Sequence, residues 1–234
     1  MRFFDVTTSW ITSVARVGSG LAVGALGPRP PKRLILYEFE ACPFCRKVRE
    51  ALSMLDLEVE IRPCPKGGRR FRPEVEARGG KAMFPYLIDE AAGVEMYESD
   101  AIVAYLYTRY GAGPVPLLLR PPLGTIGSQL AGIARAGRGR TRRGSSGRPD
   151  RVTDAPLELW SFEASPYCRL VREVLCELEL PYLLHKVAKG SPSRPAFVAR
   201  SGRMRVPYLV DPVSGRGMFE SAEIIAWLDA TWGS

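Results

Sequence analysis

The sequence predicts an α/β protein made of two copies of one domain, each with the order strand, helix, strand, helix, strand, strand, helix. Three observations lead to this prediction. The segment LILYEFEACPFCRKVREALSMLDLEVE, which begins at Leu34, recurs as LELWSFEASPYCRLVREVLCELELPYL, which begins at Leu157. The motifs MFPYLID and MYESDAIVAYL return in the same order as RVPYLVD and MFESAEIIAWL. Strand-like and helix-like hydrophobic patterns alternate within each copy.

The first strand of each copy is expected at 34–39 and 157–162, two short runs of apolar and aromatic residues. The next helix is expected to begin at Pro43 and at Pro166, because a proline at the first helical position gives up no hydrogen bond. Apolar residues then recur at i, i+4 and i+7, the spacing of one buried helix face. Each copy therefore opens with a strand, a turn and an amphipathic helix.

Second strands are expected at 59–62 and 182–187. The third strands follow Pro85 and Pro207, since proline is tolerated where a strand begins. A glycine turn, a fourth short strand and a last helix complete each copy. The sequence thus predicts two tandem βαβαββα domains, each with a mixed four-stranded sheet and helices on both faces.

The repeat divides the chain into four parts. An N-terminal helical segment (1–33) precedes the first domain (34–112), and a helix-containing, Arg/Gly/Ser-rich linker (113–155) precedes the second (156–234). SWITSVARVGSG in the first part resembles SQLAGIARAGRG in the linker, so a short helix is expected ahead of each copy. The first part also fits a targeting peptide, and both interpretations stay open. The stretch 137–149 of the linker is expected to be disordered.

Composition narrows the function. The 234 residues are 46% hydrophobic, which suits packed cores, and no apolar stretch reaches the roughly 18–20 residues of a membrane span. The single histidine, His185, argues against a multi-histidine site, and we expect no metal. The spacing of the five cysteines suggests no paired disulfide framework, and a C-x-x-C in a βαβ context indicates redox chemistry in a reducing compartment. The linker's eight arginines and two aspartates carry most of the net charge of +8, but no aromatic residues are interleaved, so no nucleic-acid binding is expected.

Cys42 and Cys45 frame the start of the first long helix. Free N–H groups and the helix dipole at such a position lower a cysteine pKa from about 8.5 to as little as about 3.5. Arg46 and Lys47 are expected to add positive charge nearby. Cys45, one turn further on, can attack a mixed disulfide at Cys42 and resolve it. We therefore expect a redox-active Cys42; a pair of half-buried structural thiols is the alternative.

The second copy has Ser165 where the first has Cys42. A serine forms no disulfide, but its hydroxyl can donate a hydrogen bond to the sulfur of a bound thiol. The alternative is a decayed copy that is kept for packing. Cys168 remains without its partner and is expected to be a half-buried helix residue, while Cys64 and Cys176 are expected to fill the core.

Together these residues resemble the thioredoxin-like superfamily, specifically glutaredoxins and the N-terminal domains of glutathione S-transferases. Cys42-Pro-Phe-Cys45 is similar to the glutaredoxin motif C-P-[YF]-C. Two X-Pro pairs, one in each copy, stand where the family has its cis-proline, and we expect both bonds to be cis. Two Glu-Ser pairs resemble the transferase E-S dipeptide that precedes the last helix. The resemblance covers both repeats.

The resemblance implies glutathione as co-substrate. In that family the cis-proline loop pairs with the backbone of glutathione's cysteine, and the E-S pair binds the γ-glutamyl carboxylate and amine. We expect Ser99 and Ser221 to be N-caps, where free N–H groups await a carboxylate. By this likeness the glutathione-binding residues are Phe84, Pro85, Glu98, Ser99, Ser165, Val206, Pro207, Glu220 and Ser221.

The chain departs from the transferases in two respects. Ser165 resembles the serine that some transferase classes use at this position, while Cys42 resembles glutaredoxins, so one redox-type and one serine-type module are joined. Transferases continue with an all-helical domain that holds the hydrophobic co-substrate, and here the linker or the end of the sequence stands in that place. The chain resembles the tandem-domain thioredoxin-like proteins of plants, algae, cyanobacteria and bacteria. That likeness implies a cytoplasmic location, with a plastid as the alternative.

The leading functional prediction is a glutathione-dependent thiol–disulfide oxidoreductase that acts on disulfide-containing or glutathionylated proteins. A non-enzymatic module that binds glutathione or a protein is the main alternative. A glutathione transferase-like enzyme without the helical domain is the second. Contact with a membrane surface, through residues 1–30 or the Arg-rich linker, stays open.

Overall fold

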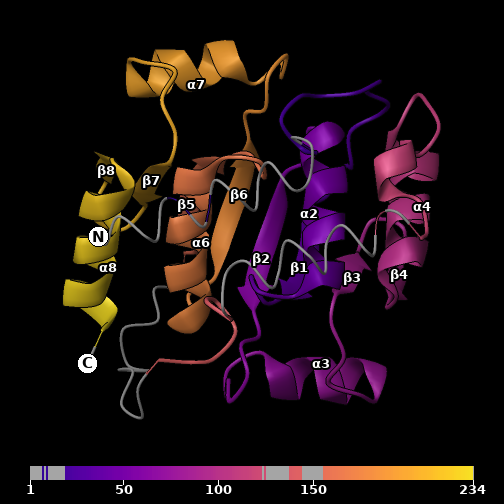
Figure 1. Ribbon diagram of the computed structural model, residues 1–234, viewed down its shortest axis with the longest axis horizontal. Helices are drawn as coiled ribbons and strands as arrows, with labels where there is room; N and C mark the ends of the chain where they lie inside the picture. Colours follow the sequence, from indigo (N-terminus) through magenta and orange to yellow (C-terminus); the bar gives the residue numbers. More distant parts are fainter. Residues whose placement is uncertain are drawn as a thin grey trace.

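The chain folds into two consecutive α/β units that share one sheet (Figure 1). The helices expected within 1–33 and within the linker fall largely outside the part of the chain that can be described. The computed structural model describes residues 19–122, 137–143 and 155–233, together with Thr7, Ser9 and Gly124.

Both copies have the predicted order of elements. The first contains β1 (Leu34–Glu38), α2 (Pro43–Met54), β2 (Val59–Pro63), α3 (Arg72–Gly79), β3 (Tyr86–Asp89), β4 (Val94–Met96) and α4 (Ser99–Tyr110). The second contains β5 (Leu157–Ser161), α6 (Pro166–Glu177), β6 (Tyr182–Lys186), α7 (Arg194–Ser201), β7 (Tyr208–Asp211), β8 (Arg216–Phe219) and α8 (Ser221–Trp232). Within the described residues no helix is both long and apolar enough to cross a membrane.

The two predicted four-stranded sheets are halves of one eight-stranded sheet. Its strand order is β4-β3-β1-β2-β6-β5-β7-β8. Within each half the first two strands are parallel and the others antiparallel. The halves join where β2 pairs antiparallel with β6, with Val59 opposite Leu184 and Ile61 opposite Tyr182. We call this junction, with the helix faces that meet above it, the seam.

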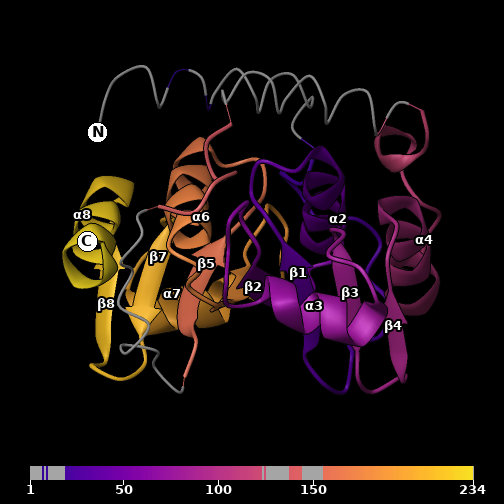
Figure 2. The same ribbon diagram turned by 90° about the horizontal axis from the view of Figure 1, so that it is seen from below.

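Helices cover both faces of the sheet, as predicted (Figure 2). Alternate residues of a strand point to opposite faces, so Leu34 and Leu36 pack under α2 and α4, whereas Tyr37 packs under α3. The cluster on the first face continues across the seam, because Leu157 and Leu159 of the second copy belong to it. The opposite face has separate clusters for the two copies. The copies therefore share one core on one face only.

The antiparallel seam turns the second copy end over end relative to the first. β1 is parallel to β2 and β5 is parallel to β6, so β1 and β5 run in opposite directions. Consistent with this, α3 and α7 lie at opposite ends of the molecule (Figure 1). The two helix starts that carry Cys42 and Ser165 consequently lie at opposite ends of the sheet.

Two short segments cross from one copy to the other. Residues 19–23, ahead of the first copy, pair with Lys189 in the second, and residues 138–142, ahead of the second copy, pair with Lys66 in the first. The Val23 N–H donates to the Lys189 carbonyl at 2.9 Å. The crossing segments begin at the ends of the two similar stretches noted in the sequence, at 19–20 and 138–139, and continue beyond them.

One expectation about the linker is wrong. Residues 137–143 were expected to belong to a disordered stretch, yet Arg143 forms ion pairs with Glu177 and Asp229. Arg142 likewise pairs with Glu179 at 2.9 Å. Arginine side chains that composition assigns to a solvated linker are here held by carboxylates of the second copy. The stretch 144–149 lies outside the described residues.

Candidate functional site

Cys42 lies in the turn between β1 and α2, directly before Pro43, the first residue of the helix. Its backbone is extended, and its Sγ accepts a hydrogen bond from the Cys45 N–H at 3.3 Å. The sulfur thus takes the place of the oxygen that usually caps a helix. Cys42 is 3% exposed and Cys45 is fully buried, so the protein encloses both thiols.

The surroundings separate the cysteines electrostatically. A hydrogen bond from the Cys45 side chain lowers the pKa of Cys42, against the effect of burial, and the N–H groups of Cys45 and Phe44 act in the same direction. Burial raises the pKa of Cys45 well above its usual value, and it also raises the pKa of Cys64 and Cys176. The structure therefore favours a thiolate at Cys42 and a protonated thiol at Cys45.

The basic residues after the motif do not act as expected. Arg46 and Lys47 are 2% and 0% exposed. Lys47 forms an ion pair with Asp100 at the start of α4. Burial lowers the pKa of Arg46, and the attraction of Glu163 across the seam opposes this shift most strongly. The hydrogen bond from Cys45 is the largest cause that lowers the pKa of Cys42, and neither Arg46 nor Lys47 is among the main causes.

Strand pairing brings the motifs of the first copy together. β1, β3 and β4 pair antiparallel in turn, so the loop after β1, the start of β3 and the end of β4 share one end of the sheet. These places carry Cys42, Pro85 and Ser99. The rings of Phe39 and Phe84 are also in contact, with centroids 6.2 Å apart, which ties the cysteine loop to the proline loop.

Both predicted cis bonds are confirmed: Phe84–Pro85 and Val206–Pro207 are cis. In the second copy β5, β7 and β8 repeat the pairing of the first, so Ser165, Pro207 and Ser221 gather at the opposite end of the sheet. The fold thus presents the predicted site residues as two separate groups, one in each copy.

The prediction that Ser99 and Ser221 are N-caps is wrong. They are the first residues of α4 and α8, and the residues before them, Glu98 and Glu220, have φ values of 69° and 62°. The chain passes from strand to helix within that one left-handed residue, so the serine is already helical. A non-glycine residue at positive φ is costly and persists where its surroundings fix it, commonly at ligand sites.

Ser165 reproduces the geometry of Cys42. Its Oγ accepts a hydrogen bond from the Cys168 N–H at 3.3 Å, and its backbone is extended in the same way. Ser165 is 4% exposed. Near this helix start, the Ser9 hydroxyl donates to the Pro166 carbonyl at 2.9 Å, and Arg169 donates to the Ser9 carbonyl at 2.6 Å. A residue ahead of the first copy therefore lies over the first turn of α6.

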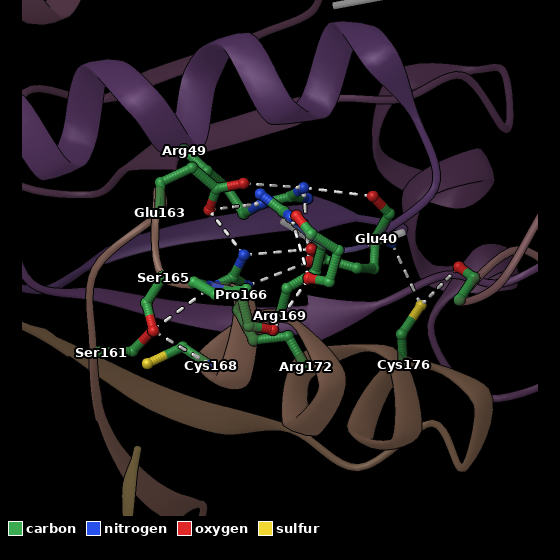
Figure 3. A network of polar contacts seen from close by, with 12 residues as sticks. Glu40, Arg49, Ser161, Glu163, Ser165, Pro166, Cys168, Arg169, Arg172 and Cys176 are labelled. Carbon is green, nitrogen blue, oxygen red and sulfur yellow. Dashed lines mark hydrogen bonds and ion pairs between the residues drawn. The ribbon is translucent and has the colours of Figure 1, made fainter. Parts of the chain in front are cut away.

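The sequence did not lead us to a group of buried charges at the seam (Figure 3). Arg49 of α2 pairs with Glu163 at 3.2 Å, and Arg172 of α6 pairs with Glu40 at 3.1 Å. Burial opposes the charge on Glu163, but Arg172 and Arg49 hold its pKa below the usual range. None of these members is more than 2% exposed: Glu38, Glu40, Arg49, Glu163, Arg172 and Lys186.

A signal for this seam was present in the repeat. Arg49 matches Arg172, and Glu40 matches Glu163, at the same offset as the cysteine motif. Charged residues kept in both copies beside an apolar helix stripe can mark a buried ionic contact as well as a solvated face.

Two further features lie apart from the predicted residues. A cavity of about 300 Å³ between α6 and α8 is lined by Leu170, Ala222 and Asp229 among others, and by none of the predicted site residues. Within the described residues no group of three or more His, Cys, Asp or Glu side chains is arranged to hold a metal ion.

Comparison with known proteins gives a family. The profile of the glutathione S-transferase N-terminal domain matches residues 36–114 and again residues 159–233. One similar solved structure, from Leishmania, is described as a unique trimeric glutathione transferase; it is 15% identical, over 87% of this chain and 68% of that chain, with a TM-score of 0.31. At that TM-score the similarity bears on neither fold nor function. No curated protein sequence was found to match.

Proposed function

Because the chain belongs to the family of glutathione S-transferase N-terminal domains, which matches it in both copies, we propose that it is a glutathione-dependent thiol–disulfide oxidoreductase. Cys42 is the nucleophile. The substrates are disulfide-containing or glutathionylated proteins, and glutathione is the reductant.

The geometry at the start of α2 carries this proposal. A thiolate is the reactive form of cysteine, and the Cys42 pKa is lowered while that of Cys45 is raised. The Cys42 thiolate attacks the glutathione sulfur of a glutathionylated protein, which leaves as a thiolate and takes up a proton. A second glutathione thiolate then attacks the mixed disulfide, which releases glutathione disulfide and restores Cys42. With a protein disulfide, Cys45 loses its proton and attacks the mixed disulfide at Cys42, which releases the substrate thiolate and forms a Cys42–Cys45 disulfide. Two glutathione molecules then reduce this disulfide and leave as glutathione disulfide.

Glutathione would bind beside Cys42 through Phe84, Pro85, Glu98 and Ser99. The strand pairing that gathers these residues, and the left-handed Glu98 that turns the chain into α4, support this assignment. The free N–H groups at the start of α4 suit the γ-glutamyl carboxylate.

The second copy would bind glutathione without redox chemistry. Ser165, Val206, Pro207, Glu220 and Ser221 repeat the arrangement of the first copy with a hydroxyl in place of the thiol. Arg205 pairs with Glu220 at 2.9 Å, so the ammonium group of glutathione would have to compete with or displace this arginine.

A second candidate function has one observation in its favour. Cys42 is only 3% exposed, and an enclosed thiol suits binding better than attack on a protein disulfide. In this case both copies bind glutathione or a protein partner and neither turns over.

Turnover of a glutathionylated peptide by single-cysteine variants separates the two candidates. We expect Cys42→Ser to abolish activity and Cys45→Ser to retain a monothiol route through glutathione. Cys168→Ser is the matched control, because Cys168 occupies in α6 the position of Cys45 in α2, and it should leave the rate unchanged. Full activity in Cys42→Ser would overturn the assignment of Cys42 as the nucleophile, and no activity in the unmodified protein would favour the binding function.

A further inference from the structure

The loop that leads to Cys42 is held by residues from outside its own copy. The Glu40 N–H donates to Sγ of Cys176 in α6, at 3.4 Å. The Ala41 N–H donates to the carbonyl of Gly139, in a crossing segment, at 3.3 Å. Both backbone donors that directly precede Cys42 therefore depend on residues that come 98 or more positions later in the sequence.

The side chain of Glu40 is anchored in the same direction. Arg172 of α6 donates from Nε and Nη2 to the two carboxylate oxygens of Glu40, at 3.2 and 3.1 Å (Figure 3). Both residues are 1% exposed. A two-pronged arginine–carboxylate contact fixes orientation as well as distance. From its own copy, the Glu40 carbonyl accepts a hydrogen bond from Arg49 at 3.1 Å.

The second copy is held by the first in the same way. The Glu163 N–H donates to the Ser53 hydroxyl at 3.3 Å, and Ser53 is the match of Cys176. Arg49, the match of Arg172, contacts both carboxylate oxygens of Glu163, at 3.2 and 3.4 Å. The loop before each site is thus anchored by the opposite long helix.

We propose that Arg172 and Cys176 are positioning residues for the Cys42 thiol, so that the active site of the first copy is complete only when the second copy is docked against it. This inference rests on the proposed role of Cys42 as the nucleophile. By fixing residues 39–41, the two residues of α6 keep the Cys42 sulfur over the N–H groups at the start of α2. The second copy thereby contributes to the reaction at Cys42 although it has a serine, Ser165, in place of the nucleophile.

Several other charged residues lie near the contact between Arg172 and Glu40. Glu38 in β1 pairs with Arg49 of α2, and Glu163 receives both Arg49 and Arg172. Lys186 lies on β6 beneath them. The Glu40 carboxylate also lies 3.3 Å from Nη2 of Arg49. Replacing Arg172 therefore removes one of its two cations, the one that holds both carboxylate oxygens, two residues from Cys42. A less compensated negative charge and a looser loop both disfavour a thiolate.

The test is the pH dependence of iodoacetamide alkylation at Cys42, followed by peptide mass spectrometry in the full chain. We expect Arg172→Gln to move the midpoint upward by about one pH unit, with Arg172→Lys in between, since lysine keeps the charge but not the two-pronged contact. Cys176→Ala removes only the sulfur that accepts the Glu40 N–H and should shift the midpoint in the same direction by less.

Two controls match these variants. Ser53→Ala removes the equivalent acceptor from the opposite loop and should leave the Cys42 profile unchanged. Arg143→Gln removes a linker arginine that pairs with Glu177, the last residue of α6, and should also have no effect.

An unchanged Cys42 midpoint in folded Arg172→Gln would overturn the proposal. If that variant does not fold, an unchanged midpoint in Cys176→Ala has the same force. A midpoint near 8.5 in the unmodified protein would instead refute the proposed nucleophile, so the two failures are told apart.

Discussion

Lys186 places an amine in the seam where the first copy has none. It is 2% exposed, and burial lowers its pKa to about 7. The matching residue of the first copy is Pro63, so the fold itself does not require a charge at this position. Lys186 is therefore a candidate for a residue whose charge costs stability.

Replacing Lys186 by methionine should stabilise the protein near neutral pH. The folded pKa lies below the unfolded value of about 10.4, so the stability linked to this group is complete above pH 10.4 and is lost as the pH falls through about 7. We expect Lys186→Met to gain up to about 4 kcal/mol at pH 6 and to lose that advantage near pH 10.5. Urea unfolding at the two pH values measures the difference; equal stability of both proteins at pH 6 would contradict it.

At the residue scale, the sequence predicted those properties that depend only on neighbouring residues in the chain. The position of Cys42 before Pro43 was enough to predict a lowered pKa, because a helix start supplies its own N–H donors. The helical position of Ser99 was not predicted, because it follows from the left-handed φ of Glu98. That φ depends on how β4 meets α4, and no glycine in the sequence indicates it. Arg46 and Lys47 were misjudged because helix direction alone does not say what packs beside them.

At the scale of elements, the crossing segments rely on glycine. Gly20 has a φ of +78°, and a Cβ at this residue would come within 2.9 Å of the Glu163 Cβ. Gly80, at the end of α3, has the same φ but faces open space. Comparing substitutions at these two glycines separates the free-energy cost of a left-handed backbone from the cost of a steric contact with Glu163.

Alanine should therefore be tolerated at one glycine and not at the other. We expect Gly80→Ala to cost about 1–2 kcal/mol, the price of a left-handed alanine. Gly20→Ala should cost a further 1–3 kcal/mol or so, because it pushes the crossing segment away from Glu163. Thermal or urea unfolding measures the stability of both variants. Equal losses of stability would mean that the crossing segment moves away from Glu163 at no cost.

The elements themselves were predictable and their long-range partners were not. Hydrophobic spacing and the two prolines located the strands and long helices to within about a residue, since those signals are local. Nothing in 19–23 indicates a strand partner near Lys189, more than 160 residues away. Only the weak similarity to the linker showed that the segment had a repeated structural use.

At the scale of the whole molecule, one sheet and one shared core predict one unfolding transition. Separating the copies would expose the edges of β2 and β6, and it would take Arg172 from Glu40 and Arg49 from Glu163. Breaking a buried ion pair in this way is strongly destabilising. The two copies should therefore unfold together rather than as independent domains.

The tryptophans allow a direct check. Three of the four tryptophans, Trp160, Trp227 and Trp232, lie in the second copy, and Trp10 precedes the first. A Trp10→Phe background therefore makes the fluorescence report on the second copy, whereas far-UV circular dichroism reports both copies. We expect the urea midpoints from fluorescence and from circular dichroism to coincide, with a single slope. Two separate midpoints would show that the copies are independent.

The repeat predicted two copies but not their joint sheet. Two tandem domains can pair through edges, faces or not at all, and the choice depends on how residues far apart in the chain complement each other. Arg49 and Arg172, and the glutamates that recur with them, were the residues that indicated how the copies meet. A charged residue on a helix is, however, usually expected to face the solvent. The joint sheet follows once those charges are seen to be buried.

The exchange of arginines between the copies bears on how a duplicated gene diverges. A spare copy that is independent can decay once its reaction is lost, because nothing else depends on it. Here the arginine that secures the loop of Cys42 is inherited on the copy that carries Ser165. With the proposed role of Arg172, a change at Ser165 leaves the loop of Cys42 in place, whereas a change at Arg172 reaches the other copy, so the second copy is not free to vary at every position.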